Sequence, residues 1–137
     1  MHSIKTEETL ANSKAFVFAL ENFLELVKNG HADTELAFIN SCKVTYAISE
    51  KNEILGCTVW GIIKQKSSAW IYFSATDKKH RKKGIHSEII KEVEKQAKIL
   101  KCKAVYAGIH VSNAPMNLAM KKSGYSQSWY RVKKEIK

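Results

Sequence analysis

The sequence predicts an α/β (α+β) fold with a mixed, mainly antiparallel sheet and flanking helices, in a single domain over residues 1–137. Two observations carry this prediction. Three strand-like segments follow one another with short polar turns between them, which indicates an antiparallel meander. A strand, a helix and a second strand come next, and a unit of this length is typical of two parallel strands joined by a right-handed crossover.

The N-terminal region predicts a long amphipathic helix over residues 6–28. Acidic residues stand near its start and Gly30 follows its end. Its apolar residues recur at helical spacing, which is typical of a face that packs on a core. These residues are Phe16, Leu20, Phe23, Leu24 and Val27.

The expected meander consists of strands at residues 44–49, 54–65 and 69–76. Residues 50–53 and 66–68 form the polar turns between them.

A helical apolar period then runs from Ile85 to Leu100, so we expect a helix that ends near Lys101. Its outward face carries Glu and Lys three and four residues apart, which supports an exposed helix face. The next expected strand covers residues 104–111.

A third helix is expected to begin at Asn113, which is a good N-cap, with Pro115 in its first turn. Gly124 supplies the left-handed residue that ends it. We expect a last strand over residues 126–136.

The charge of the chain is strongly basic and unevenly distributed. There are 23 Lys and Arg against 13 Asp and Glu, a net charge of +10. Residues 1–40 hold 3 basic and 6 acidic side chains, net −3, whereas residues 41–137 hold 20 and 7, net +13. This excess indicates a polyanionic ligand, either a phosphate-bearing cofactor or a nucleic acid. A Lys-rich solvated surface is the alternative explanation for part of it.

Other features restrict the class of protein. The chain has three cysteines without a C-x-x-C pair, which disfavours disulfide frameworks and metal sites, so we expect buried thiols and no metal. The first ten residues lack the apolar region of a secretory signal, and no stretch is long and apolar enough for a membrane span. We therefore expect a cytoplasmic protein without a membrane partner.

The junction between the third strand and the next helix carries the strongest functional signal. A helix that begins after a strand offers free backbone N–H groups and a positive dipole end, and both favour phosphate. Lys78, Lys79 and His80 precede this helix, and Gly84 allows a ligand to approach the backbone closely. The segment matches neither G-x-x-x-x-G-K-[ST] nor G-x-G-x-x-G, so nucleotide hydrolysis and dinucleotide redox chemistry are disfavoured.

The segment Arg81-Lys82-Lys83-Gly84-Ile85-His86 resembles the R-x-x-G-x-[G/A] pyrophosphate loop of the GNAT acyltransferase superfamily. Ile54-Leu55-Gly56 after a polar turn, the β-α-β unit, and Asn113 eleven residues before Gly124-Tyr125 agree with it. The resemblance covers roughly residues 44–126.

The resemblance implies a GNAT-like acetyltransferase domain with acetyl-CoA between two splayed parallel strands, residues 69–76 and 104–111. Ser74, Ala75 and Thr76 would pair through their backbone with the acyl carbonyl and pantetheine. The backbone of Arg81, Lys82, Lys83, Gly84, Ile85 and His86 would hold the pyrophosphate. Asn113 would reach the pantetheine or the acceptor, and a primary amine would attack the thioester directly.

Two positions depart from the family's pattern. His86 stands where Gly or Ala is usual, so its ring must point away from the cofactor or cover it. Met120 stands where many members have a tyrosine that protonates the leaving thiolate, and Met has no proton to donate. His110 is the best-placed candidate for a general base, because its ordinary pKa suits neutral pH. A structural histidine is the alternative.

The predicted function is N-acetyl transfer from acetyl-CoA to an amine. A polyanionic acceptor, an amine on tRNA, on aminoacyl-tRNA or on DNA, is favoured by the charge of residues 41–137. Protein and small-amine acceptors stay open, as does a weakly catalytic nucleic-acid-binding or effector module on the same fold. The sequence leaves the oligomeric state undetermined.

Overall fold

The computed structural model describes residues 1–8, 13–30, 42–109, 112–128, 134 and 136. Within them the chain forms a five-stranded sheet in the order β1-β2-β3-β4-β5. The first four strands are antiparallel, and β5 lies parallel to β4. The strands are β1 (His2–Glu8), β2 (Lys43–Ser49), β3 (Ile54–Ile63), β4 (Ser68–Thr76) and β5 (Val105–Ala107).

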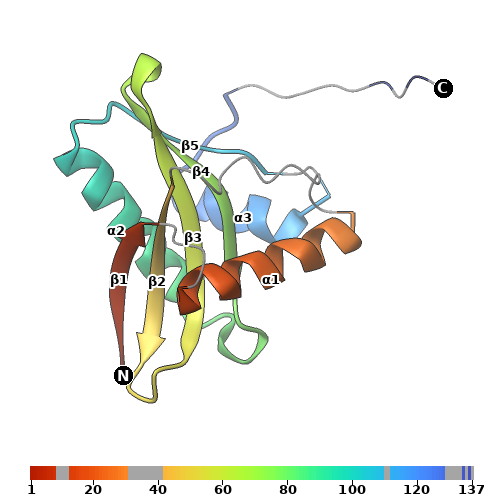
Figure 1. Cartoon of the computed structure of the whole chain (residues 1–137). Coiled ribbons are helices and arrows are strands. Elements are labelled where there is room, and N and C mark those ends of the chain that lie inside the picture. The colour runs from red at the N-terminus through yellow and green to blue at the C-terminus, as the bar shows by residue number, and fades with distance from the viewer. Residues whose placement is uncertain (9–12, 31–41, 110–111, 129–133, 135, 137) are drawn as a thin grey trace.

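Three helices cover the two faces of the sheet (Figure 1). They are α1 (Lys14–Lys28), α2 (Ile85–Ile99) and α3 (Ala114–Lys122), with short 3₁₀ turns η2 (Lys64–Lys66) and η3 (Lys78–His80). One buried cluster joins α1 to its face of the sheet, and the other joins α2 and α3 to the opposite face. The helix α2 connects β4 to β5, as the β-α-β prediction requires.

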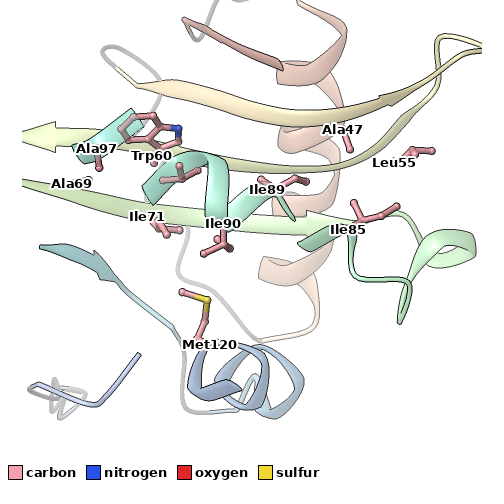
Figure 2. Packing of buried hydrophobic residues seen from close by; sticks show 11 residues of the cluster. Ala47, Leu55, Trp60, Ala69, Ile71, Ile85, Ile89, Ile90, Ala97 and Met120 are labelled. Carbon is pink, nitrogen blue, oxygen red and sulfur yellow. The ribbon is translucent and has the colours of Figure 1, made fainter. Parts of the chain in front are cut away.

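The cluster under α2 holds the largest fully buried side chain, Trp60 (Figure 2). Ile85, Ile89 and Ile90 of α2 are all nearly inaccessible to solvent and pack in the same cluster. Met120 reaches this cluster from α3, with its side chain toward Ile90 in Figure 2. Burial of such side chains contributes roughly 1.5–3 kcal/mol each, so this cluster holds α2 on the sheet.

A chain of hydrogen bonds crosses this apolar cluster from β3 to α2. The indole N–H of Trp60 donates to the hydroxyl of Thr45 at 2.9 Å, which lies 2.7 Å from the hydroxyl of Thr6. The amide of Gln96 on α2 donates to the same Thr6 hydroxyl at 2.6 Å. Because a buried polar group without a partner costs free energy, this chain of bonds fixes the position of α2 relative to β1, β2 and β3.

The sequence prediction is wrong at the start of the chain. Residues 2–8 form β1, which pairs with β2 over seven positions, and the helix begins only at Lys14. Ser13 is the N-cap of α1, and its hydroxyl accepts from the N–H of Phe16 at 3.0 Å. The only aliphatic side chain within β1 is Ile4, so this edge strand lacks the alternating apolar pattern by which strands are recognised.

The end of the chain also differs from the prediction. Of the strand expected over residues 126–136, residues 126–128, 134 and 136 have no regular secondary structure, and the others lie outside the described residues. The strand expected over residues 104–111 is confirmed only as the short β5. Gly108 and Ile109 lie beyond its end, and residues 110–111 lie outside the described residues.

The remaining predicted elements are confirmed within a few residues. The three meander strands, α2 and α3 are present, and the second strand is followed by η2 rather than continuing to Gln65. The three cysteines are free thiols. Cys42 and Cys57 are buried as expected, whereas Cys102 is only half-buried. Among the described helices, none is long and apolar enough to cross a membrane.

Gly56 sets how closely α2 approaches the sheet. A β-carbon at this position would lie 3.0 Å from the carbonyl oxygen of Ala75, 3.3 Å from Ile85 and 3.4 Å from Ile89. The first turn of α2 therefore packs directly over the glycine. This contact positions the start of α2, and with it the loop that precedes the helix.

We expect Gly56→Ala to lower the free energy of unfolding by about 1–3 kcal/mol, because the extra methyl group overpacks this contact. Gly108→Ala is the matched control, since its β-carbon would meet nothing closer than 3.5 Å, an ordinary contact with Trp70. The control should change stability by about 0.5 kcal/mol or less. Urea unfolding of the two variants measures the difference, and equal losses would show that the contact at Gly56 is unimportant.

Candidate functional site

The strand β4 changes its hydrogen-bonding side partway along its length. Val59 pairs with Phe73 but Trp60 pairs with Ile71, so Tyr72 is an extra residue and forms a β-bulge. The bulge also places Ile71 and Phe73 in the clusters on opposite faces of the sheet, although they are two residues apart.

The bulge decides which backbone groups face β5. Before it, the N–H of Ala69 donates to the carbonyl of Ala104, and the carbonyl of Ile71 accepts from Gly108. After it, the N–H of Asp77 donates to Leu55 on β3. Since alternate residues of a strand direct their backbone groups to opposite sides, Phe73 and Ala75 face β3, whereas Ser74 and Thr76 face away from it.

The strand β5 does not reach this second half of β4. The two strands pair only at Ala69–Val105, Trp70–Tyr106 and Ile71–Ala107. In the part of the chain that the structure describes, no strand pairs with the outward backbone groups of Ser74 and Thr76. The Ser74 hydroxyl is held 2.7 Å from that of Thr58, which fixes this segment of β4 in place.

The loop between β4 and α2 continues from this free edge. Lys82 and Gly84 both have left-handed backbone conformations, with φ of 61° and 80°. Such residues turn successive N–H groups toward one side, as in backbone sites that bind anions. The side chain of Arg81 donates to the carbonyl of Thr76 at 3.1 Å, and the ring of His80 lies 2.9 Å from the carboxylate of Asp77. These two contacts fasten the loop to the end of β4.

The N–H groups of residues 82–87 have no acceptor within the described residues. The first backbone bond of α2 runs from the N–H of Glu88 to the carbonyl of Gly84 at 3.1 Å. Lys78, Lys79, Arg81, Lys82 and Lys83 surround these groups with exposed cationic side chains. Free N–H groups, the positive end of α2 and this cluster of cations all favour the binding of a phosphate group.

His86 lies at the second position of α2 and is half-buried. Its Nε2 atom is buried and has no hydrogen-bond partner. Burial lowers the pKa of the imidazole below its ordinary value, which favours the neutral ring. The ring therefore has one polar atom without a partner, at the start of α2 beside the loop that follows β4.

Asn113 is the N-cap of α3, and its side-chain oxygen accepts from the N–H of Met116 at 3.4 Å. Pro115 lies in the first turn and Gly124 after the helix has φ of 90°, so both helix signals are confirmed. His110 lies outside the described residues, so the predicted proximity of His110 and Asn113 stays a prediction.

Two side chains in or near α3, Met120 and Tyr125, are held by packing or by a hydrogen bond to α2. Met120 is 3% exposed and packs in the cluster beneath α2. The hydroxyl of Tyr125 donates to Glu94 on α2 at 2.9 Å, and burial raises the pKa of this phenol. In the described structure the Tyr125 hydroxyl is therefore committed to a carboxylate.

Sequence reasoning missed the bulge at Tyr72 and the pair formed by Asp77 and His80. Asp77 and His80 are three residues apart, a spacing at which two side chains can meet across one turn, so their contact had a usable signal. The bulge had no such signal in the sequence, because the run of apolar and aromatic residues around Tyr72 shows no change of period.

Comparisons with known proteins agree with this architecture. Residues 12–125 match the model of the acetyltransferase (GNAT) family. No curated protein matches the sequence significantly.

Several solved structures share the fold at low sequence identity. A ribosomal-protein-alanine N-acetyltransferase from Brucella melitensis biovar Abortus 2308 has a TM-score of 0.77 at 9% identity, covering 99% of this chain and 100% of that one. An aminoglycoside acetyltransferase from an uncultured soil metagenomic sample has a TM-score of 0.72 at 16% identity, covering 98% and 97%.

The aminoglycoside N-acetyltransferase AAC(6')-Iy, solved in complex with CoA, has a TM-score of 0.69 at 10% identity, covering 98% of this chain and 99% of that one. Members of this family use acetyl-CoA as the acyl donor. From the family match over most of its length, this chain belongs to the GNAT acetyltransferase family.

Proposed function

We propose that this GNAT acetyltransferase moves an acetyl group from acetyl-CoA to a primary amine, with the donor bound along the free edge of β4 and the loop that follows it. The observation that carries the proposal is the direct continuity of two sets of backbone groups that no described strand pairs with. One set belongs to Ser74 and Thr76 on β4, where the Thr76 carbonyl accepts from the side chain of Arg81. The other consists of the N–H groups of residues 82–87. A ligand that is extended at one end and carries phosphate at the other fits both sets.

Each part of the chain has a separate role in this proposal. The backbone groups of Ser74 and Thr76 would pair with the amide-bearing arm and the acyl carbonyl, as an added strand would, with Ala75 as the residue between them. The N–H groups of Arg81, Lys82, Lys83, Gly84, Ile85 and His86 would hold the pyrophosphate. When bound, acetyl-CoA supplies an acyl carbonyl and a thiol leaving group.

The chain's own contribution to the reaction is positioning and proton removal. We assign His110 the role of general base for the amine, and we assign the side-chain amide of Asn113 a contact to the acceptor or to the pantetheine arm. Because Met120 is buried and has no proton to give, the thiolate would leave without a protein acid at this position. A thiol with a pKa of about 8.5 is a fair leaving group near neutral pH.

His86 would close the phosphate site from the side of α2. Its buried Nε2 would gain a hydrogen-bond partner if a ligand oxygen came within reach. In this role the ring covers the ligand, which is the second of the two positions that the sequence leaves open for it.

The identity of the amine acceptor is inferred from the charge of the chain. The net charge of +13 over residues 41–137 favours an amine carried by a polyanion, such as tRNA, aminoacyl-tRNA or DNA. A small cationic amine is the second candidate, because Glu21 exposes a carboxylate on α1, one turn before Glu25, whose carboxylate lies 3.5 Å from the ammonium group of Lys78. Two solved structures that share this fold are of aminoglycoside acetyltransferases, which also supports this candidate.

A transfer assay tests the function directly. We expect thiol release from acetyl-CoA to accelerate on addition of an amine acceptor, and isotopically labelled acetyl-CoA in cell extract to identify the acceptor by mass spectrometry. A folded protein that binds acetyl-CoA but labels nothing would contradict the transfer step.

If His110 is the base, His110→Gln should remove the acidic limb of the pH–rate profile.

We expect Gly84→Val to abolish acetyl-CoA binding while the protein still folds. A β-carbon at Gly84 meets no atom within 4 Å, so the substitution causes no clash, but φ of 80° is a strained conformation for a branched residue. The loop would relax to another conformation and turn its N–H groups away. Calorimetric titration measures the effect, and unchanged affinity in a folded variant would refute this placement of the pyrophosphate.

The burial of His86 predicts a pH dependence of stability. Its pKa is lowered in the folded protein from 6.5, so below about pH 6.5 the unfolded state takes up the proton first. This histidine therefore makes the protein less stable as the pH falls from 6.5 toward the folded pKa. His86→Gln should lose less stability than the unchanged protein between pH 7 and pH 5 in urea unfolding, and parallel losses would argue against a buried neutral ring.

A further inference from the structure

A second basic surface lies at the end of the sheet where β3 turns into β4. Two of its lysines are on η2, and two follow the end of α2. Backbone pairing holds these segments together, because the N–H of Lys103 donates to the carbonyl of Ser67 at 2.7 Å. We call this the hairpin-end surface, and its four exposed lysines are Lys64, Lys66, Lys101 and Lys103.

No carboxylate neutralises these lysines nearby in the sequence. Residues 54–76 and residues 95–134 contain no Asp or Glu at all. None of the four lysines forms an ion pair among the described residues. Four like charges therefore stand together on one surface, and an anionic partner would relieve their repulsion.

A pair of aromatic rings lies beside the lysines. Trp70 on β4 and Tyr106 on β5 are register partners, and their rings stack with centroids 5.9 Å apart at an interplanar angle of 26°. Both side chains are only half-buried. The ammonium group of Lys66 lies 5.6 Å from the centroid of the Tyr106 ring, so aromatic and cationic groups belong to the same surface.

The hairpin-end surface lies too far from the phosphate-binding loop to share its ligand groups. The lysines adjoin the first residue of β4, whereas the loop follows the last, and Figure 1 shows the two at opposite ends of the strand. Eight steps along a strand at ~3.3 Å each separate them by roughly 26 Å. The pyrophosphate of acetyl-CoA bound at the loop would leave these four charges unused.

We propose that the hairpin-end surface binds single-stranded nucleic acid, with phosphates on the four lysines and a base on the aromatic pair. Clustered cations next to half-exposed aromatic rings are what single-stranded nucleic acid requires, because each base has a face that can stack. The binding itself is independent of acetyl transfer. It rests on the proposed function only for its purpose, which is to bring an amine on the strand to the free edge of β4.

An anionic membrane is the strongest competing partner. Ile99 and Leu100 expose apolar surface directly before Lys101, and basic residues beside apolar ones attract anionic lipid. The aromatic stack favours the nucleic acid, because these rings lie within paired strands of the sheet rather than at a projecting tip.

The test measures binding of a fluorescent single-stranded oligonucleotide of about 20 residues by anisotropy, without acetyl-CoA. If all four lysines contact phosphates, affinity should fall about 50-fold between 50 and 200 mM salt, because each contact contributes about 0.7 to the logarithmic slope for single strands. Replacing the four lysines by Gln should weaken binding at least about tenfold at low salt and flatten this dependence.

A variant with the same loss of charge elsewhere is the control, and its exposed lysines are Lys28, Lys51, Lys91 and Lys95. It should bind within about twofold of the unchanged protein. Equal weakening in both variants, or no binding at low salt, would overturn the proposal.

Two further probes separate the possible partners. An oligomer of equal length without bases should bind at least about fivefold more weakly, on the order of one stacked base. Equal affinity for that oligomer would refute the role of Trp70 and Tyr106. Anionic phosphatidylserine vesicles should compete poorly, and tighter binding to vesicles would assign the surface to lipid. Since acetyl-CoA binding and thiol release are measured separately, failure of either function is distinguishable from failure of this one.

Discussion

The architecture depends on one constraint, that backbone N–H and C=O groups away from water need partners. Among the described residues, the strand β4 pairs on both sides only in its first half. Beyond the bulge at Tyr72, one side still pairs with β3 while β5 has already ended. In the part of the chain that the structure describes, the second half of β4 therefore has an open edge that an extended ligand could pair with, and this edge ends near the start of α2, where free N–H groups and positive charge lie together.

Packing between α2 and the sheet fixes the position of the helix start relative to this edge of β4. Ile85 and Ile89 lie against Gly56, and the buried bonds from Trp60 to Gln96 fix α2 further along its length. The loop between β4 and α2 has little freedom, because Arg81 and Asp77 anchor it at the strand end. A fixed arrangement of donors reduces the entropic cost of ordering on binding, which favours the binding of a long, flexible ligand.

Much of this arrangement could be predicted from sequence, and the failures have physical causes. Gly84 and Gly124 are visible because glycine tolerates left-handed conformations, and Asn113 because capping residues are few. The loop and the parallel crossover followed from such local signals. The strand β1 escaped because its pairing with β2, rather than its own apolar pattern, makes it a strand. The bulge at Tyr72 escaped for a similar reason, since only the pairing with β3 reveals it.

Amide hydrogen exchange with and without acetyl-CoA tests the central claim most directly, because it reports on backbone N–H groups one by one. We expect acetyl-CoA to slow exchange at Ser74 and Thr76 and across residues 82–87, where N–H groups face neither β3 nor another acceptor in the described structure. The slowing caused by acetyl-CoA should be smaller at Ala75, because its backbone already faces β3. Protection confined to other segments, or none at saturating acetyl-CoA, would contradict the account.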